Sequence, residues 1–180
     1  MRTALLVIDM QQGSFETPTA RHDTDGVVSR INALASRVRA AGGLVLHIQH
    51  DGPPGDPFQP GEPGWQFLPD LRPAADDLVV HKTSCDAFLD TSLDQALKQN
   101  GVDRVIVTGC ATDYCVDTTI RSALARGYPT TVPADGHTTA DRPYLPAQKI
   151  IEHHNFVWSD FISPAGPARV IPCADIELSA

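Results

Sequence analysis

One cysteine lies where the sequence predicts that a buried strand leads into a helix. Cys115 stands between the apolar run 104–107, which predicts a strand, and a helix-like pattern over 116–124. The free N–H groups and positive dipole end of a helix start stabilise an anion, so we expect a lowered thiol pKa and a partly ionised sulfur. Such a thiolate is a nucleophile. The alternative is a small buried cysteine that only packs the helix.

Two charged residues follow other predicted strands. Asp9 ends the apolar run 4–8, and Lys82 follows a strand expected over 77–81. The carboxyl ends of parallel strands share one sheet edge, where open α/β sheets place their ligand crevice. Considered alone, Asp9 could equally be a turn residue, and a lysine in the position of Lys82 is usually a solvated surface charge. Because Cys115 is expected on the same edge, the three residues together predict a functional site.

The elements that must position these residues alternate between strand and helix. Strands are expected at 4–8, 44–50, 77–81, 104–107 and 128–132, helices at 26–41, 91–99, 116–126 and 146–154, and a final strand or extended tail over 156–158 and 168–172. The first strand, helix and second strand form a βαβ unit with parallel strands. The sequence therefore predicts an α/β fold: a three-layer α/β/α sandwich with a mostly parallel sheet of five to six strands. We expect residues 1–180 to form one domain.

Composition restricts the partners. The net charge of −8 argues against nucleic acid and anionic membrane surfaces. The first apolar run is too short to cross a bilayer and does not resemble a signal peptide. The four cysteines lack the spacing of a disulfide framework or a zinc site. We expect a cytoplasmic protein that acts on a small molecule, without nucleic acid or membrane partners.

A long loop over 51–73 is rich in proline and glycine and carries Phe58 and Trp65. Long ordered loops in compact domains are usually functional. We expect this loop to cover a substrate site or to contact a second subunit. The alternative is a plain surface excursion.

Three motifs resemble the isochorismatase-like cysteine hydrolases, a family that includes nicotinamidases and N-carbamoylsarcosine amidases. They are Val-Ile-Asp-Met-Gln at 7–11, Val-Val-His-Lys at 79–82 and Gly-Cys-Ala-Thr-Asp-Tyr-Cys-Val at 109–116. The resemblance covers nearly the whole chain. It implies a catalytic triad of Asp9, Lys82 and Cys115.

The resemblance also implies the surroundings of the nucleophile. The family places a non-proline cis peptide at the position of Cys110 and Ala111, although Val or Ile usually replaces Cys110. The N–H groups of Ala111 and Cys115 would form an oxyanion hole. Asp9 would accept the thiol proton, and the sulfur would attack a small amide or a related C–N bond through a thioester.

Further expectations concern the substrate and the assembly. We expect Gln11, Phe58, Trp65, Phe88 and Tyr114 to contact substrate. We also expect a homo-oligomer, either a dimer or a tetramer.

The sequence departs from the nicotinamidases in one region. Those enzymes carry a metal site of Asp and His residues after the second strand, whereas His47, His50 and Asp51 lack that spacing. Neighbours on a strand point to opposite faces, so these three side chains are not expected to converge. We therefore expect no metal and no cofactor.

Three other functions remain open. One is an isochorismatase that cleaves a vinyl ether. Another is a thiol redox sensor that uses Cys110 and Cys115, although their spacing gives no signature of a resolving pair. The third is a non-catalytic α/β binding module.

Overall fold

The computed structural model describes residues 2–16 and 20–178, and a parallel sheet runs through its centre. The strands are β1 (Arg2–Ile8), β2 (Leu44–His50), β3 (Leu78–Lys82), β4 (Val102–Cys110), β5 (Thr130–Pro133), β6 (His137–Thr138) and β7 (Arg169–Ile171). Their order is β3-β2-β1-β4-β5-β7, with β6 paired to β4, and every pairing is parallel. The predicted parallel sheet is confirmed. It has seven strands rather than five or six, because β6 has only two residues and leaves no pattern in the sequence. Strand β7 lies within the final strand or tail expected over 168–172.

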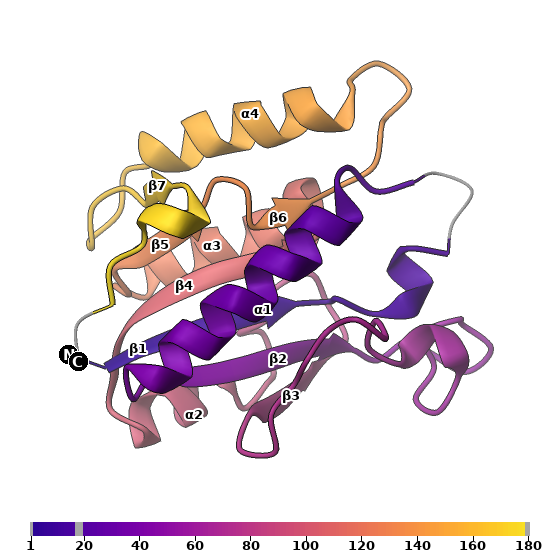
Figure 1. Cartoon of the computed structure of the whole chain (residues 1–180), viewed down its shortest axis with the longest axis horizontal. Coiled ribbons are helices and arrows are strands. Elements are labelled where there is room, and N and C mark those ends of the chain that lie inside the picture. The colour runs from indigo at the N-terminus through magenta and orange to yellow at the C-terminus, as the bar shows by residue number, and fades with distance from the viewer. Residues whose placement is uncertain (1, 17–19, 179–180) are drawn as a thin grey trace.

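Helices cover both faces of this sheet, as Figure 1 shows. They are α1 (Thr24–Ala40), α2 (Leu93–Gln99), α3 (Asp117–Ala125) and α4 (Ala147–Ser159). Helix α1 lies on one face, and α2 and α3 lie on the other. The predicted three-layer α/β fold is therefore confirmed.

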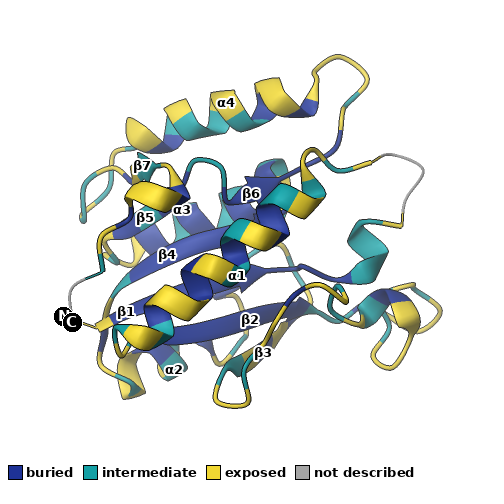
Figure 2. Cartoon of the chain, in the orientation of Figure 1, coloured by how far each residue is buried: buried dark blue, intermediate teal, exposed yellow. Residues whose placement is uncertain are grey.

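Strand β1 is buried on both faces, which explains its uninterrupted apolar sequence. Ala4, Leu6 and Ile8 pack in the core that includes α2 and α3, whereas Leu5 and Val7 pack against α1. Alternate side chains of a strand point to opposite faces, so three residues of this run pack in one layer and two in the other. In Figure 2 the central strands are accordingly dark blue.

Helix α1 buries one apolar stripe against the sheet. Val27, Ile31, Leu34 and Val38 recur at three- and four-residue steps and are buried. The helix begins at Thr24, two residues before the predicted start, and Asp23 holds the N-cap position.

Helix α4 is longer than its sequence predicts. The pattern over 156–158 favours a strand, but the structure continues the helix to Ser159. The reason is the packing of Trp158, which is fully buried, while Phe156 is 68% exposed. Trp158 also donates a 2.7 Å hydrogen bond to the Asp117 carboxylate. This tertiary anchor outweighs the strand preference of aromatic residues.

The strand order reverses direction at β1. The chain passes from β1 through β2 to β3 on one side, and β4 then pairs with the other side of β1. Ligand crevices of open α/β sheets lie at such a switch point, outside the carboxyl ends of the strands. Asp9 follows β1 there, and Cys110 ends β4.

The two switch-point strands approach closely at Gly109. This residue has a φ of +119°, and a Cβ atom there would collide with the Ile8 carbonyl oxygen and lie 2.6 Å from the Ile8 nitrogen. Only glycine fits this backbone conformation and this spacing.

We therefore predict that Gly109→Ala lowers the free energy of unfolding by about 3 kcal/mol or more, because steric overlap adds to backbone strain. The matched control is Gly127→Ala, since Gly127 also has positive φ (+84°) but open space around its Cα. The control should lose only about 1 kcal/mol. Urea unfolding followed by circular dichroism measures both, and equal losses would contradict the steric argument.

Candidate active site

Three strand ends bring Asp9, Lys82 and Cys115 together. The Lys82 Nζ lies 2.7 Å from Asp9 Oδ2 and 3.4 Å from Cys115 Sγ. Lys82 also donates to the Ser84 carbonyl at 2.8 Å. One buried ammonium thus joins a carboxylate, a sulfur and a backbone oxygen.

Asp9 occupies an unusual backbone conformation. Its φ is +46°, in the left-handed region that aspartate tolerates better than most residues. Its N–H donates to the Ile48 carbonyl at 2.9 Å, which ties the residue to β2. Oδ2 is paired with Lys82, whereas Oδ1 is buried without a hydrogen-bond partner among the described residues. One carboxylate oxygen therefore remains available to accept a proton.

Burial and charge act on Asp9 and Lys82 in opposite ways. Burial raises the pKa of Asp9, and the Lys82 ammonium only partly offsets that rise. Burial alone would lower the pKa of Lys82, but the neighbouring Asp9 and Cys115 raise it above its ordinary value. Lys82 therefore remains charged when Asp9 is ionised.

The pKa of the Cys115 thiol is raised rather than lowered, contrary to the expectation from its place near a helix start. Burial raises its pKa, the Asp9 charge raises it further, and Lys82 opposes both only in part. The surroundings of Cys115 therefore disfavour the thiolate, and the Asp9 carboxyl group is one of the causes.

A π-helical turn over Thr112–Val116 holds Cys115 ahead of α3. The peptide bond between Cys110 and Ala111 is cis. The Ala111 carbonyl accepts hydrogen bonds from the N–H groups of Tyr114 at 3.0 Å and Val116 at 3.1 Å. Ala111 and Cys115 themselves line the same pocket.

A buried histidine supports the start of this turn. The His137 Nδ1 lies 2.9 Å from the Thr112 hydroxyl, and its Nε2 lies 3.0 Å from the Asn155 side-chain oxygen. The imidazole also packs edge-on against Trp158, with ring centroids 5.1 Å apart. Strand β6 and helix α4 therefore brace the cysteine turn from behind.

The pocket above the cysteine has a volume of about 390 Å³. Its lining comprises Asp9, Ser14, Arg21, His50, Phe58, Thr83, Ser84, Cys85, Cys110, Ala111, Tyr114, Cys115 and Arg142. Phe58 and Tyr114 were both expected to contact substrate, and both lie here. The loop over 51–73 contributes Phe58, whose ring meets the His50 ring edge-on at 5.7 Å. Part of that loop therefore borders the pocket of its own chain.

Gln11, which was expected to contact substrate, is not among the residues that line the pocket. It is fully buried, and its amide donates to the carbonyls of His50 at 3.0 Å and Trp65 at 2.9 Å. Its side-chain oxygen accepts from the His50 N–H at 2.8 Å. Gln49 donates to the same Trp65 carbonyl at 2.9 Å. These two glutamines anchor the long loop to β2.

Trp65 and Phe88, for which substrate contact was also expected, are likewise absent from the pocket lining. The Trp65 ring stacks on His81 at 5.9 Å and donates to the Asp51 carboxylate at 2.7 Å. Phe88 is 5% exposed and packs in the core against Tyr128. Each aromatic ring is used in structural packing.

Several lining residues had no clear sequence signal. Residues 83–85 follow Lys82 directly, so their place on the sheet edge could have predicted them. Arg21 and Arg142 lie in irregular segments without periodicity. Only the fold brings these two arginines to one pocket.

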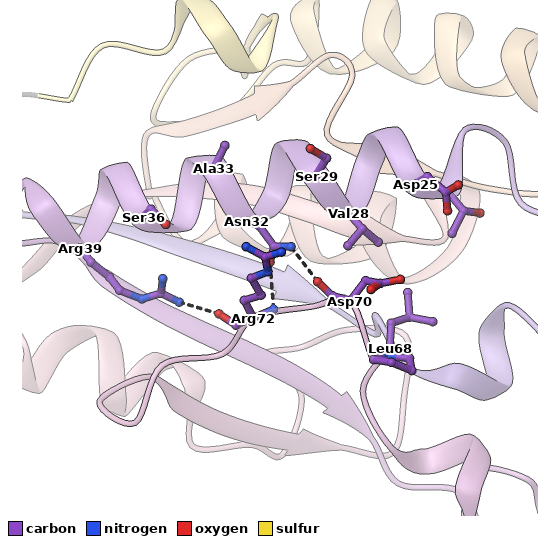
Figure 3. Close-up of a pocket in the computed structure, with 12 residues that line it drawn as sticks. Asp25, Val28, Ser29, Asn32, Ala33, Ser36, Arg39, Leu68, Asp70 and Arg72 are labelled. Atoms are coloured by element: carbon purple, nitrogen blue, oxygen red, sulfur yellow. Dashed lines mark hydrogen bonds between the residues drawn. The ribbon is translucent and has the colours of Figure 1, made fainter.

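A larger cavity lies elsewhere, between α1 and the segment 68–72 (Figure 3). It measures about 660 Å³, but none of the three charged or nucleophilic residues above lines it. Its polar groups bond to one another: the Asn32 amide donates to the Asp70 carbonyl at 2.8 Å and accepts from the Arg72 N–H at 2.9 Å. The chemistry therefore points to the smaller pocket.

The residues considered as metal ligands have separate partners. His47 Nε2 lies 3.0 Å from the Asp77 carboxylate, the His50 ring packs on Phe58, and Asp51 bonds to Trp65. Among residues 2–16 and 20–178, no group of three His, Cys, Asp or Glu side chains is arranged to hold a metal ion. In the same described ranges, every helix is too short or too polar to cross a membrane.

An open parallel sheet with a cysteine, a carboxylate and an ammonium at its carboxyl edge defines the class: an α/β cysteine hydrolase. Residues 3–152 match the isochorismatase domain, and the chain belongs to that family.

Named relatives and solved structures agree with this membership. A streptothricin hydrolase of Streptomyces noursei is 41% identical over 143 residues, which cover 79% of this chain and 57% of that protein. This chain thus spans little more than half of that relative's length. An isochorismatase from Pseudomonas putida KT2440 superimposes with a TM-score of 0.87 at 29% identity, covering 98% of this chain and 90% of that one. N-carbamoylsarcosine amidase from Thermoplasma acidophilum gives 0.79 at 26% identity, with coverages of 98% and 99%.

The buried imidazole predicts a pH dependence of stability. Burial lowers the pKa of His137 from 6.5 to about 4. Between these values the unfolded chain binds a proton that the folded chain does not. The free energy of unfolding should therefore fall by about 3 kcal/mol as pH drops across this window.

Urea unfolding at several pH values, with wild type and His137→Gln, isolates this contribution from other titrating groups. The variant should lose this part of the pH dependence. Parallel pH curves for the two proteins would contradict the prediction.

Proposed function

We propose that this protein is a cysteine hydrolase that cleaves a small-molecule amide or a related C–N bond. The observation that carries the proposal is the buried Asp9–Lys82 pair in contact with Cys115 at the floor of a pocket of about 390 Å³. A pocket of this size suits a small ligand. We also propose a cytoplasmic homo-oligomer that needs no metal or cofactor.

In the first half-reaction Asp9 acts as a general base. Its free Oδ1 takes the proton of the Cys115 thiol while the sulfur bonds to the carbonyl carbon. The negative charge moves to the carbonyl oxygen, which the N–H groups of Ala111 and Cys115 would stabilise. Protonated Asp9 then gives its proton to the leaving nitrogen, the C–N bond breaks and an amine departs.

In the second half-reaction the thioester is hydrolysed. Asp9, again a carboxylate, removes a proton from water as the oxygen attacks the thioester carbon. The C–S bond breaks, the acid product leaves, and the sulfur regains a proton. Lys82 keeps its charge throughout, because its role is to stabilise the carboxylate and the sulfur as negative charge moves between them.

Several observations bear on the choice between amide cleavage and the alternative functions. An amidase among the solved structures supports amide cleavage, whereas another neighbour is an isochorismatase, so vinyl ether cleavage stays the second candidate. A redox pair is disfavoured, since burial raises the pKa of Cys110 to about 12 and leaves no resolving thiolate. A plain binding module gives no reason for a charged pair buried beside a thiol.

We predict that Cys115→Ala folds normally and loses at least about a thousandfold in kcat/KM, since the attacking sulfur is absent. The assay is ammonia or amine release from a panel of simple amides, N-carbamoylsarcosine and streptothricin, with isochorismate run beside them.

The matched control is Cys173→Ala, which removes a buried thiol outside the pocket and should retain activity. Amide turnover that survives in the Cys115 variant would exclude the thioester route. Turnover of isochorismate alone would favour the vinyl ether candidate.

A pH profile tests the role of Asp9. Because burial raises the pKa of this carboxyl above its ordinary 3.8, the acid limb of kcat/KM should have its midpoint above that value. Activity should be complete well above the folded-state pKa and decline as pH falls through it. Circular dichroism at each pH confirms that the chain stays folded, and a midpoint at or below 3.8 would argue against Asp9 as the base.

A further inference from the structure

Two arginines line the same pocket as Cys115, and they differ in how their charge is balanced. Arg142 makes two hydrogen bonds to the Asp113 carboxylate, at 2.8 and 2.9 Å, and its guanidinium lies 5.0 Å above the Tyr114 ring. The Thr139 hydroxyl donates to the same carboxylate at 2.6 Å. Asp113 therefore neutralises the charge of Arg142 and fixes its orientation in the pocket wall.

Arg21 is held differently. Its Nε donates to the Ser14 carbonyl at 2.7 Å, and its backbone forms an antiparallel bridge with Ala140. Within residues 2–16 and 20–178, the Nε contact is the one hydrogen bond of this guanidinium, and Arg21 forms no ion pair with a carboxylate there. Among the described residues, the guanidinium is thus held through Nε alone.

Both arginines lie close to the base of the pocket. Although burial raises the pKa of Cys110 to about 12, the positive charges of Arg21 and Arg142 act to lower it. Cys110 and Cys115 line the same pocket, so the Arg21 charge acts on the space in front of the nucleophile.

Two of the three charged side chains that line the pocket form ion pairs. Asp9 is paired with Lys82, and Arg142 is paired with Asp113. Of the Arg, Lys, Asp and Glu side chains that line the described pocket, Arg21 is the one without a counter-charge. The protein as a whole has a net charge of −8, so this positive site contrasts with the rest of the molecule.

We propose that Arg21 binds an anionic substituent of the substrate, and that the substrate class is small amides that also carry a carboxylate. This inference rests on the proposed amide hydrolysis for its substrate class. A guanidinium presents parallel N–H groups that match a carboxylate, and such charge-assisted bonds are stronger than neutral ones. The apolar part of the substrate would lie against Phe58 and Tyr114, which line the same pocket.

The kinetic test compares acid amides with neutral amides of equal length. Succinamate is paired with butanamide and glutaramate with pentanamide, so that a methyl group replaces the carboxylate. Wild type should prefer the acid amides by about tenfold to a hundredfold in kcat/KM. Arg21→Gln should remove this preference, and Arg21→Lys should restore part of it.

The matched control is Lys149→Gln, which removes an exposed positive charge on α4, outside the pocket. It should leave the preference unchanged. Arg21→Gln should have the circular dichroism spectrum and the urea unfolding midpoint of wild type, which shows that the variant is folded whatever its turnover. An unchanged preference in Arg21→Gln would overturn the inference.

A second measurement does not depend on turnover. Alkylation rates of Cys115 are measured by peptide mass spectrometry with bromoacetate against bromoacetamide, and with 4-bromobutyrate against 4-bromobutyramide. Arg21→Gln should lower the ratio of acid to amide reagent by about tenfold for at least one pair.

The two measurements separate the hypotheses. A lowered alkylation ratio without hydrolysis of any amide would retain the anion site and reject the proposed function. If Arg21→Gln hydrolyses amides with an unaltered preference and an unaltered alkylation ratio, the proposed function is retained and the anion site is rejected.

Discussion

The ion pair between Asp9 and Lys82 is the constraint on which the rest of this structure depends. Both side chains are almost completely removed from water, and their charges lie 2.7 Å apart. Burying two charges is costly, and losing one partner leaves the other uncompensated. The pair therefore requires two strand ends in fixed register. Strand β2 supplies that register, because it pairs with β1 on one side and with β3 on the other.

The same pair explains why the cysteine need not be ionised in advance. A buried thiol beside a carboxylate is harder to ionise, so burial and the Asp9 charge raise the pKa of Cys115 although the Lys82 ammonium acts to lower it. The expectation of a lowered pKa, drawn from the sequence, considered only the helix start. It left out burial, which is a property of the assembled layers and which raises the pKa of both Asp9 and Cys115.

The sheet and its edge were predictable because strong local patterns encode them. A continuous apolar run identified β1, and the stretch Leu-Val-Leu-His-Ile-Gln-His identified β2. Each is followed or ended by a polar residue at the carboxyl edge. The pocket wall was not predictable in this way. Arg21 and Arg142 belong to irregular segments, and Gln11 follows the same strand as Asp9 yet points into a backbone network. The predicted end of α4 was wrong because Trp158 is positioned by a hydrogen bond to Asp117, which is distant in the sequence.

The anchoring of the loop over 51–73 has a consequence for how this pocket can diversify. Gln11 and Gln49 both hold the loop through the carbonyl oxygen of Trp65, which every amino acid possesses. The attachment therefore places no demand on the side chain at that position. A loop of different sequence can therefore accept the same two hydrogen bonds from Gln11 and Gln49. The loop supplies Phe58 to the pocket, so its sequence can change the pocket wall while the strand ends stay in place.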